Sequence, residues 1–307
     1  MRTRVLLTSI TLSFFFAGCD SLRAGKDAAL SAVASRVPQA AIEKMDDAAW
    51  QGLKPTLTLI EDPEALAELA ALSAPLTRAA DAAGAPAGRW AFHIIASAEP
   101  NAFALPGGTI GVHSGLFAVS ESGAELAGIL GHEVGHVVER HGVQGLVARA
   151  GAAAALTLLM GDVGALTHIA LEQAVGLTLL KFSRDNERQA DHTGVLLLRQ
   201  AGYPTRGLPA FFEGLQAIES GKSGTALPTS VQRAMRILST HPMSDERAAR
   251  LDALAKQDPV TELPAAEKAR YLRLRARVLA AVPADLRQKH EALAKAFQSS
   301  SKADAGF

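Results

Sequence analysis

The run His132-Glu133-Val134-Gly135-His136 lies within a mostly apolar stretch of the chain. Residues four apart on an α-helix share a face, about one turn apart, so both imidazoles can reach one metal ion. Glu133 can then stand beside that ion without binding it. A buried helix has little reason to turn such a polar trio inward unless the groups are paired or bind metal. The run therefore predicts a helix that carries part of a zinc site.

Zinc needs at least one more protein ligand, which must come from elsewhere in the chain. His141 lies five residues after His136, about 140° round a continuous helix, so it is not expected to join the site. The segment from Ser183 to Asp191 is a better source, because Glu187 and Asp191 share a helical face. Glu187 could bind the ion while Asp191 orients a histidine ring. The alternative is a solvated, charged turn of helix.

The order of these motifs resembles that of a known family. HEVGH is followed by SRDNERQAD, and then by Thr240-His241-Pro242 with Arg247 downstream. This arrangement resembles the zinc metallopeptidases of the HtpX, Oma and CAAX-prenyl-protease group, most closely their bacterial periplasmic lipoproteins. The resemblance runs from about Glu64 to Leu251, and three motifs in this order are specific.

The resemblance implies roles for individual residues. It places one zinc ion per chain on His132, His136 and Glu187. It makes Glu133 the general base and gives Asp191 the task of orienting a histidine ring.

Two further residues enter through the same resemblance. His241 is expected near the metal, either as a donor that stabilises the oxyanion or as a reversible plug on the zinc. Arg247 is expected near the same site, as a second donor to the oxyanion. The alternative is a plain helix start, with Asp245 and Glu246 in the first turn.

A small β-sheet is expected ahead of the HEVGH helix. Residues 89–97 alternate bulky and small side chains, which is typical of a strand, and Pro106-Gly107-Gly108 predicts a turn into a second strand. Similar segments in the family form an edge strand beside the zinc, and an extended peptide can add to such an edge. The resemblance therefore implies that substrate binds along Asn101, Ala102, Phe103 and Ala104. The alternative is an ordinary hairpin.

The N-terminus has the pattern of an export signal. Residues 1–18 combine early arginines with a short apolar run, and Cys19 follows in a context that resembles a bacterial lipobox, with Phe16 where leucine is usual. Cys19 is the only cysteine, so an internal disulfide is excluded. The resemblance to a lipobox implies that Cys19 is lipidated, and the alternative is a chance cysteine after a signal peptide. Asp20 weakly indicates the inner membrane.

The rest of the chain divides into expected parts by its prolines and its periodicity. Residues 151–182 are apolar but interrupted, which favours two buried or interface-lying helices joined near Gly161-Asp162 over a membrane span. Breaks are expected near Pro38 and Pro75, and a flexible loop at 220–230. The expected parts are a signal peptide at 1–18, a helical segment at 19–62, a metallopeptidase domain at 63–254, a helical hairpin at 255–298 and a disordered tail at 299–307.

Composition narrows the possible functions. The chain has 307 residues, zero formal net charge and 48% hydrophobic residues, which argues against a nucleic-acid partner and allows one sizeable core. The fold is expected to be α+β and mainly helical, with a small sheet whose edge faces the active site. The expected function is a lipid-anchored, periplasmic zinc endopeptidase that cleaves misfolded or unassembled envelope proteins. The alternative is a chaperone-like assembly factor that holds clients on its edge strand.

Overall fold

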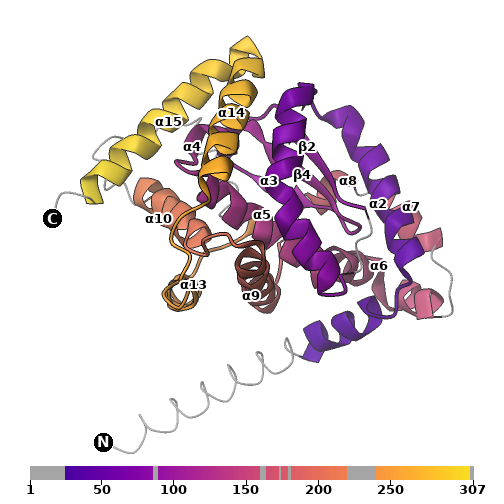
Figure 1. The fold of residues 1–307 in the computed structure, drawn as a ribbon. Coiled ribbons are helices and arrows are strands. Elements are labelled where there is room, and N and C mark those ends of the chain that lie inside the picture. Colours follow the sequence, from indigo (N-terminus) through magenta and orange to yellow (C-terminus); the bar gives the residue numbers. More distant parts are fainter. Residues whose placement is uncertain are drawn as a thin grey trace, which may run out of the picture.

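The computed structural model describes residues 25–85, 89–159, 164–172, 174–178, 181–219 and 240–304. The export signal, Cys19, Asp20, the loop expected at 220–230 and the link at Gly161-Asp162 lie outside these residues. After a first helix over residues 25–34, the helices are α2 (Gln39–Leu53), α3 (Pro63–Ala82), α4 (Ser114–Val119), α5 (Gly123–Val138), α6 (His141–Leu159), α7 (Gly164–Glu172), α8 (Ala174–Leu177), α9 (Arg184–Ala201), α10 (Gly207–Glu219), α13 (Asp245–Ala255), α14 (Ala265–Ala281) and α15 (Ala284–Asp304). A short 3-10 helix, Lys54–Thr56, follows α2. The predicted α+β, mainly helical class is confirmed (Figure 1).

Four short strands form one mixed sheet with the order β1-β2-β4-β3. They are β1 (Leu59–Ile60), β2 (Ala91–Ile95), β3 (Ala102–Ala104) and β4 (Thr109–His113). β2 and β4 are parallel, whereas β1 and β3 are each antiparallel to their neighbour. The expected hairpin is β3-β4, and β3 is an edge strand of the sheet.

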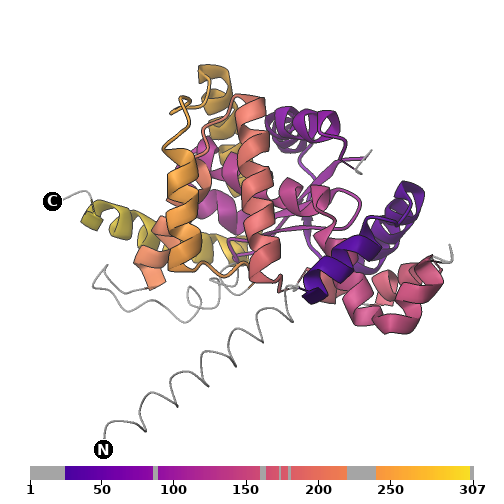
Figure 2. The same cartoon turned by 90° about the horizontal axis from the view of Figure 1, so that it is seen from below.

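The sheet separates two apolar clusters, because successive side chains of a strand point to opposite faces. Ile94 packs into the cluster with α3 and α5, whereas its neighbour Ile95 packs with α2, α6, α7 and α8. Ala102 and Phe103 divide in the same way. Figures 1 and 2 show α2 beside α7 on one side of the molecule, away from α9 and α13.

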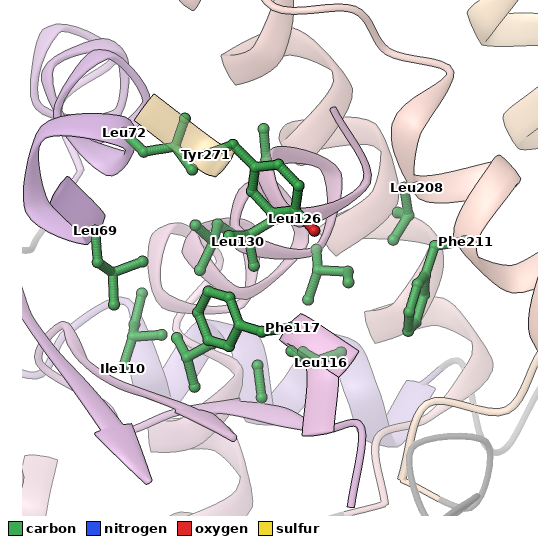
Figure 3. Packing of buried hydrophobic residues seen from close by; sticks show 14 of the residues in the cluster. Leu69, Leu72, Ile110, Leu116, Phe117, Leu126, Leu130, Leu208, Phe211 and Tyr271 are labelled. Atoms are coloured by element: carbon green, nitrogen blue, oxygen red, sulfur yellow. The ribbon is translucent and has the colours of Figure 1, made fainter. Parts of the chain in front are cut away.

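Helix α5, which carries the HEVGH run, lies at the centre of the larger cluster. Its Leu126 and Leu130 are fully buried among Leu69 of α3, Phe117 of α4 and Phe211 of α10 (Figure 3). Such burial of large apolar side chains contributes roughly 1.5–3 kcal/mol each. The core thus fixes the helix that presents the candidate metal ligands.

Glycines let α9 approach α5 closely. A Cβ atom added at Gly135 would lie 2.6 Å from the backbone oxygen of Ala190, and one at Gly194 would lie 2.9 Å from that of Gly131. Neither position leaves room for a side chain without moving backbone. The two helices therefore pack with their backbones almost in contact.

Three expectations about helix limits need correction or comment. α3 runs unbroken through Pro75, so no interruption occurs there. Helix α15 runs to Asp304, so the disordered tail expected from 299 begins too early. Between 151 and 182, α6 is kinked at Gly151, whose φ is 79°, and α7 and α8 follow. Within the described residues, none of the helices is both long and apolar enough to cross a bilayer.

A buried aspartate ties α2 to the β3-β4 turn. Asp46 is 6% exposed, and its carboxylate accepts hydrogen bonds from the backbone N–H of Gly107 at 2.7 Å and from the Thr109 hydroxyl. Burial is the main influence on this carboxyl group and raises its pKa. The contact joins the N-terminal helices to the sheet edge.

We expect Gly135→Ala to lower the free energy of unfolding by about 2 kcal/mol, because the new methyl group meets backbone. Gly131→Ala is the matched control, since its added Cβ would lie 3.3 Å from the movable side chain of Leu198. Both changes gain the same helix propensity, so their difference isolates the contact. Urea unfolding of both variants measures it; equal midpoints would contradict the close packing.

Candidate metal centre

Four buried side chains from three parts of the chain converge on one point. His132 and His136 come from α5, Glu187 comes from the first turn of α9, and His241 precedes α13. One ligand atom of each lies within 4.8 Å of the others, and all four residues are at most 4% exposed. In Figure 1, α9 lies next to both α5 and α13.

The spacing of these atoms fits a tetrahedral ion. Bonds of about 2.0–2.1 Å place the ligand atoms of a tetrahedral zinc site roughly 3.3 Å apart. His132 Nε2 lies 3.0 Å from His136 Nε2 and 3.2 Å from His241 Nδ1. Glu187 Oε1 lies 3.5 Å from His136 Nε2 and 3.1 Å from His241 Nδ1. Three protein ligands and a fourth from His241 would fill such a site.

Hydrogen bonds on the far side of each ring fix where the imidazole protons lie. Asp191 Oδ1 lies 2.9 Å from His132 Nδ1, so this nitrogen carries the proton. The side-chain amide oxygen Oε1 of Gln189 lies 3.0 Å from His141 Nε2, and we infer that this nitrogen carries the His141 proton. His141 Nδ1 is then an acceptor, and His136 Nδ1, 2.9 Å away, donates to it.

The Nε2 atoms of His132 and His136 are therefore both unprotonated. Their lone pairs face each other, and the two atoms lie only 3.0 Å apart. Two acceptors at that distance repel each other unless a cation lies between them. Glu187 Oε2 is buried and lies 2.6 Å from Arg247 Nη1, which leaves Oε1 facing His136 and His241. These donor atoms suit zinc, which prefers neutral imidazole together with a carboxylate.

His141 lies closer to this centre than the sequence predicts. The angular argument assumes an unbroken helix, but α5 ends at Val138 and Arg140 has a positive φ of 56°. The turn brings the His141 ring back against His136, with the ring fully buried. His141 is outside the group of four, as expected, but it orients one member of that group. The polar pair Glu139-Arg140 was the available signal that the helix ends there; the sequence offers no comparable signal for Gln189.

Arg247 also differs from its expected role. Ser244 accepts a hydrogen bond from the Arg247 backbone N–H and starts α13, which turns this side chain toward α9. Its Nε and Nη2 donate to Asp191 at 2.6 and 2.8 Å, and its Nη1 lies 2.6 Å from Glu187 Oε2. With the donors engaged and the residue 4% exposed, Arg247 holds the two carboxylates rather than facing an oxyanion.

The pKa shifts in the centre follow from the same contacts. Burial raises the pKa of Glu187, but the imidazoles of His241 and His136 outweigh it and hold that pKa well below its usual range. Burial also lowers the pKa of His136 far below its ordinary value. Burial lowers the pKa of His241, but the Glu187 and Glu133 carboxylates outweigh it and raise that pKa. The centre thus holds an ionised Glu187 beside a neutral His136, and these are the forms that bind a divalent cation.

Glu133 stands beside the four ligand atoms without being one of them. It is 2% exposed, and its Oε1 lies 3.6 Å from His241 Nε2. That distance exceeds a normal hydrogen bond. The carboxylate thus borders the centre on the side that His241 covers.

The predicted substrate strand packs beside α5. Asn101, Ala102 and Phe103 are at most 5% exposed, and Ala104 is partly exposed. The Asn101 amide oxygen is buried and has no hydrogen-bond donor. A peptide at this edge would meet the backbone of β3 rather than these side chains.

We expect His141→Ala to weaken zinc binding by about tenfold, because His136 loses the partner that orients it. Gln189→Ala, at the outer end of the same chain of bonds, should weaken binding in the same direction. His168→Ala, at an exposed histidine that pairs with Glu172, is the control. Competition with a chromophoric chelator gives the three affinities; unchanged values for both site variants would refute the assigned proton chain.

Comparison with known proteins places this centre in context. Mitochondrial metalloendopeptidase OMA1 of Schizosaccharomyces pombe is 32% identical over 167 residues, covering 53% of this chain and 46% of that protein. Beta-barrel assembly-enhancing protease of Escherichia coli (strain K12) is 29% identical over 221 residues, which cover 67% of this chain and 42% of that protein. Metalloprotease YcaL of the same organism is 30% identical over 161 residues, which cover 51% of this chain and 59% of that protein. The chain thus spans roughly half the length of these relatives.

The model of Peptidase family M48 matches residues 67–255, which include all four members of the metal group, Glu133, Asp191 and Arg247. That match extends over more than half of the chain. This chain therefore belongs to peptidase family M48, as the sequence motifs predict.

Proposed function

We propose that this protein is a zinc-dependent endopeptidase of the cell envelope that cleaves misfolded or unassembled envelope proteins. The observation that carries the proposal is the convergence of His132, His136 and Glu187, with the Glu133 carboxylate beside them. Family membership supports the same chemistry.

In the proposed reaction, each residue has a distinct task. A zinc ion held by His132, His136 and Glu187 would supply Lewis acidity that polarises the peptide carbonyl and lowers the pKa of the attacking water. Glu133 takes the proton of that water and passes it to the leaving amine. Asp191 and Arg247 hold the ligands in place, and the β3 edge accepts the substrate as an added strand.

His241 favours a latent resting state. Its Nδ1 occupies the fourth corner of the candidate site, where an attacking water would have to stand. Of the two roles expected for this residue, reversible plug and oxyanion donor, the contacts support the plug. Turnover then requires the segment around His241 to move.

The proposed location and clients rest on sequence and on relatives. The pattern of residues 1–18 and Cys19 indicates an exported lipoprotein in the periplasm, and Asp20 indicates the inner membrane weakly. One relative is named as a protease that enhances β-barrel assembly. Unfolded or unassembled envelope proteins are therefore the proposed substrates, with a lipid anchor as the membrane contact.

The closed site also keeps a second function open, that of a chaperone-like assembly factor which holds clients on β3. In that case proteolysis is secondary. A Glu133→Gln protein that fully restores envelope integrity in a strain lacking the gene would favour this alternative.

We expect Glu133→Gln to reduce peptide cleavage by about 10²–10⁴-fold, because the proton acceptor is lost while shape is kept. Zinc content should not change, since Glu133 is not a ligand. Casein cleavage and metal analysis of the same preparations measure both quantities. Full activity in the variant would remove Glu133 from the mechanism.

We expect His241→Ala to increase cleavage, because it opens the fourth corner of the site. His290→Ala is the control, as this buried histidine bonds Ser114 and Leu286 away from the metal group. A cleavage rate that falls by about a hundredfold would instead assign His241 to oxyanion stabilisation. An unchanged rate would exclude both roles.

A further inference from the structure

A pocket with several arginines borders the metal centre through one shared residue, Glu187. It lies between the N-terminal turns of α9 and α13, and it is lined by Arg184, Arg188, Arg247 and Arg250 together with Glu187 and Glu246. Glu187 is thus a wall of the pocket and a member of the metal group at once. An occupant of the pocket would lie against Glu187 and Arg247, on one side of the metal group.

Two of the arginines have their charge satisfied within the fold. Arg247 contacts Asp191 and Glu187, as described above. Arg188 pairs with Asp185 and lies 3.2 Å from Glu246. These pairs fix the base and one side of the pocket.

The other two, Arg184 and Arg250, have no carboxylate partner among the described residues. Both are exposed, one at the start of α9 and the other in the second turn of α13. Residues 220–239, the undescribed segment that leads into His241, contain no aspartate or glutamate, so they cannot supply one. The pocket therefore presents two guanidinium groups that form no ion pair with a described residue.

The lining also favours an organic anion over a simple ion. Pro242 and Met243 contribute apolar surface to the same wall. A guanidinium group binds a carboxylate through two parallel hydrogen bonds, and the apolar wall can cover the carbon atoms attached to it. A peptide carboxylate satisfies both parts of the surface.

We propose that this pocket binds a carboxylate of the substrate polypeptide, through Arg184 and Arg250, and so selects acidic sequences near the cleaved bond. The carboxylate can belong to an internal aspartate or glutamate, or to the C-terminus of the substrate. This inference rests on the proposed peptidase function, because it assumes that polypeptides reach the metal group.

The test measures binding separately from cleavage. Fluorescein-labelled peptides are titrated into a zinc-loaded double variant that carries Glu133→Gln and His241→Ala. The first change keeps the peptide intact, and the second removes the imidazole that covers the metal site. Paired peptides carry glutamate or glutamine at each position in turn, and a second pair ends in a free carboxylate or an amide. Anisotropy gives the dissociation constants.

We expect one acidic peptide to bind about tenfold more tightly than its neutral partner, since an exposed ion pair contributes up to about fivefold and two act together. The position of the effective glutamate, or a preference for the free C-terminus, identifies the source of the carboxylate. Adding Arg184→Gln and Arg250→Gln should abolish the difference, whereas the corresponding lysine changes should retain part of it. Arg78→Gln, an exposed arginine on α3, is the control and should leave the difference intact.

Two results would overturn the proposal: equal binding of all paired peptides, or a preference for acid that survives the two glutamine changes. Cleavage of the same peptides by the His241→Ala protein separates this inference from the proposed function. Charge-dependent binding without any cleavage would refute the peptidase while the pocket stands. Cleavage without charge dependence would refute the pocket alone.

Discussion

The contact between α5 and α9 is the constraint on which the centre depends. Two histidines one turn apart cannot hold zinc alone, and the carboxylate that joins them comes from a helix some fifty residues later in the chain. Glu187 reaches them only because the backbones nearly touch where Gly135 faces Ala190 and Gly194 faces Gly131. The glycine of HEVGH therefore has a packing function that is as necessary to the site as the histidines.

Around that contact, polar groups are arranged in pairs that leave the buried charges compensated. Asp191 contacts both His132 and Arg247. Gln189 contacts His141, which in turn orients His136. A buried carboxylate without such partners would cost several kcal/mol. The network holds the ligands in one geometry and leaves two lone pairs facing each other, a state that a divalent cation relieves.

Much of this arrangement could be predicted from sequence because it depends on local periodicity. The helix around HEVGH, the helix of Glu187 and the turn before β4 follow from spacing and turn residues, and the family follows from the resemblance of three motifs in order. What could not be predicted depends on where one element stops. The position of His141 follows from a single left-handed residue, Arg140, which no propensity rule would favour there. Arg247 matched the family motif, but only its contacts showed that its donors face carboxylates.

The link from Asp46 to Gly107 and Thr109 bears on how the protein can be divided. The region that matches the family begins at residue 67, after α2 has ended, so a fragment cut at that point would lack Asp46. The tight turn ahead of β4 would then lose a buried acceptor for its amide, and β3 would lose the support of the helix behind it. The folded unit around the metal group accordingly extends beyond the region that matches the family model, and it includes α2.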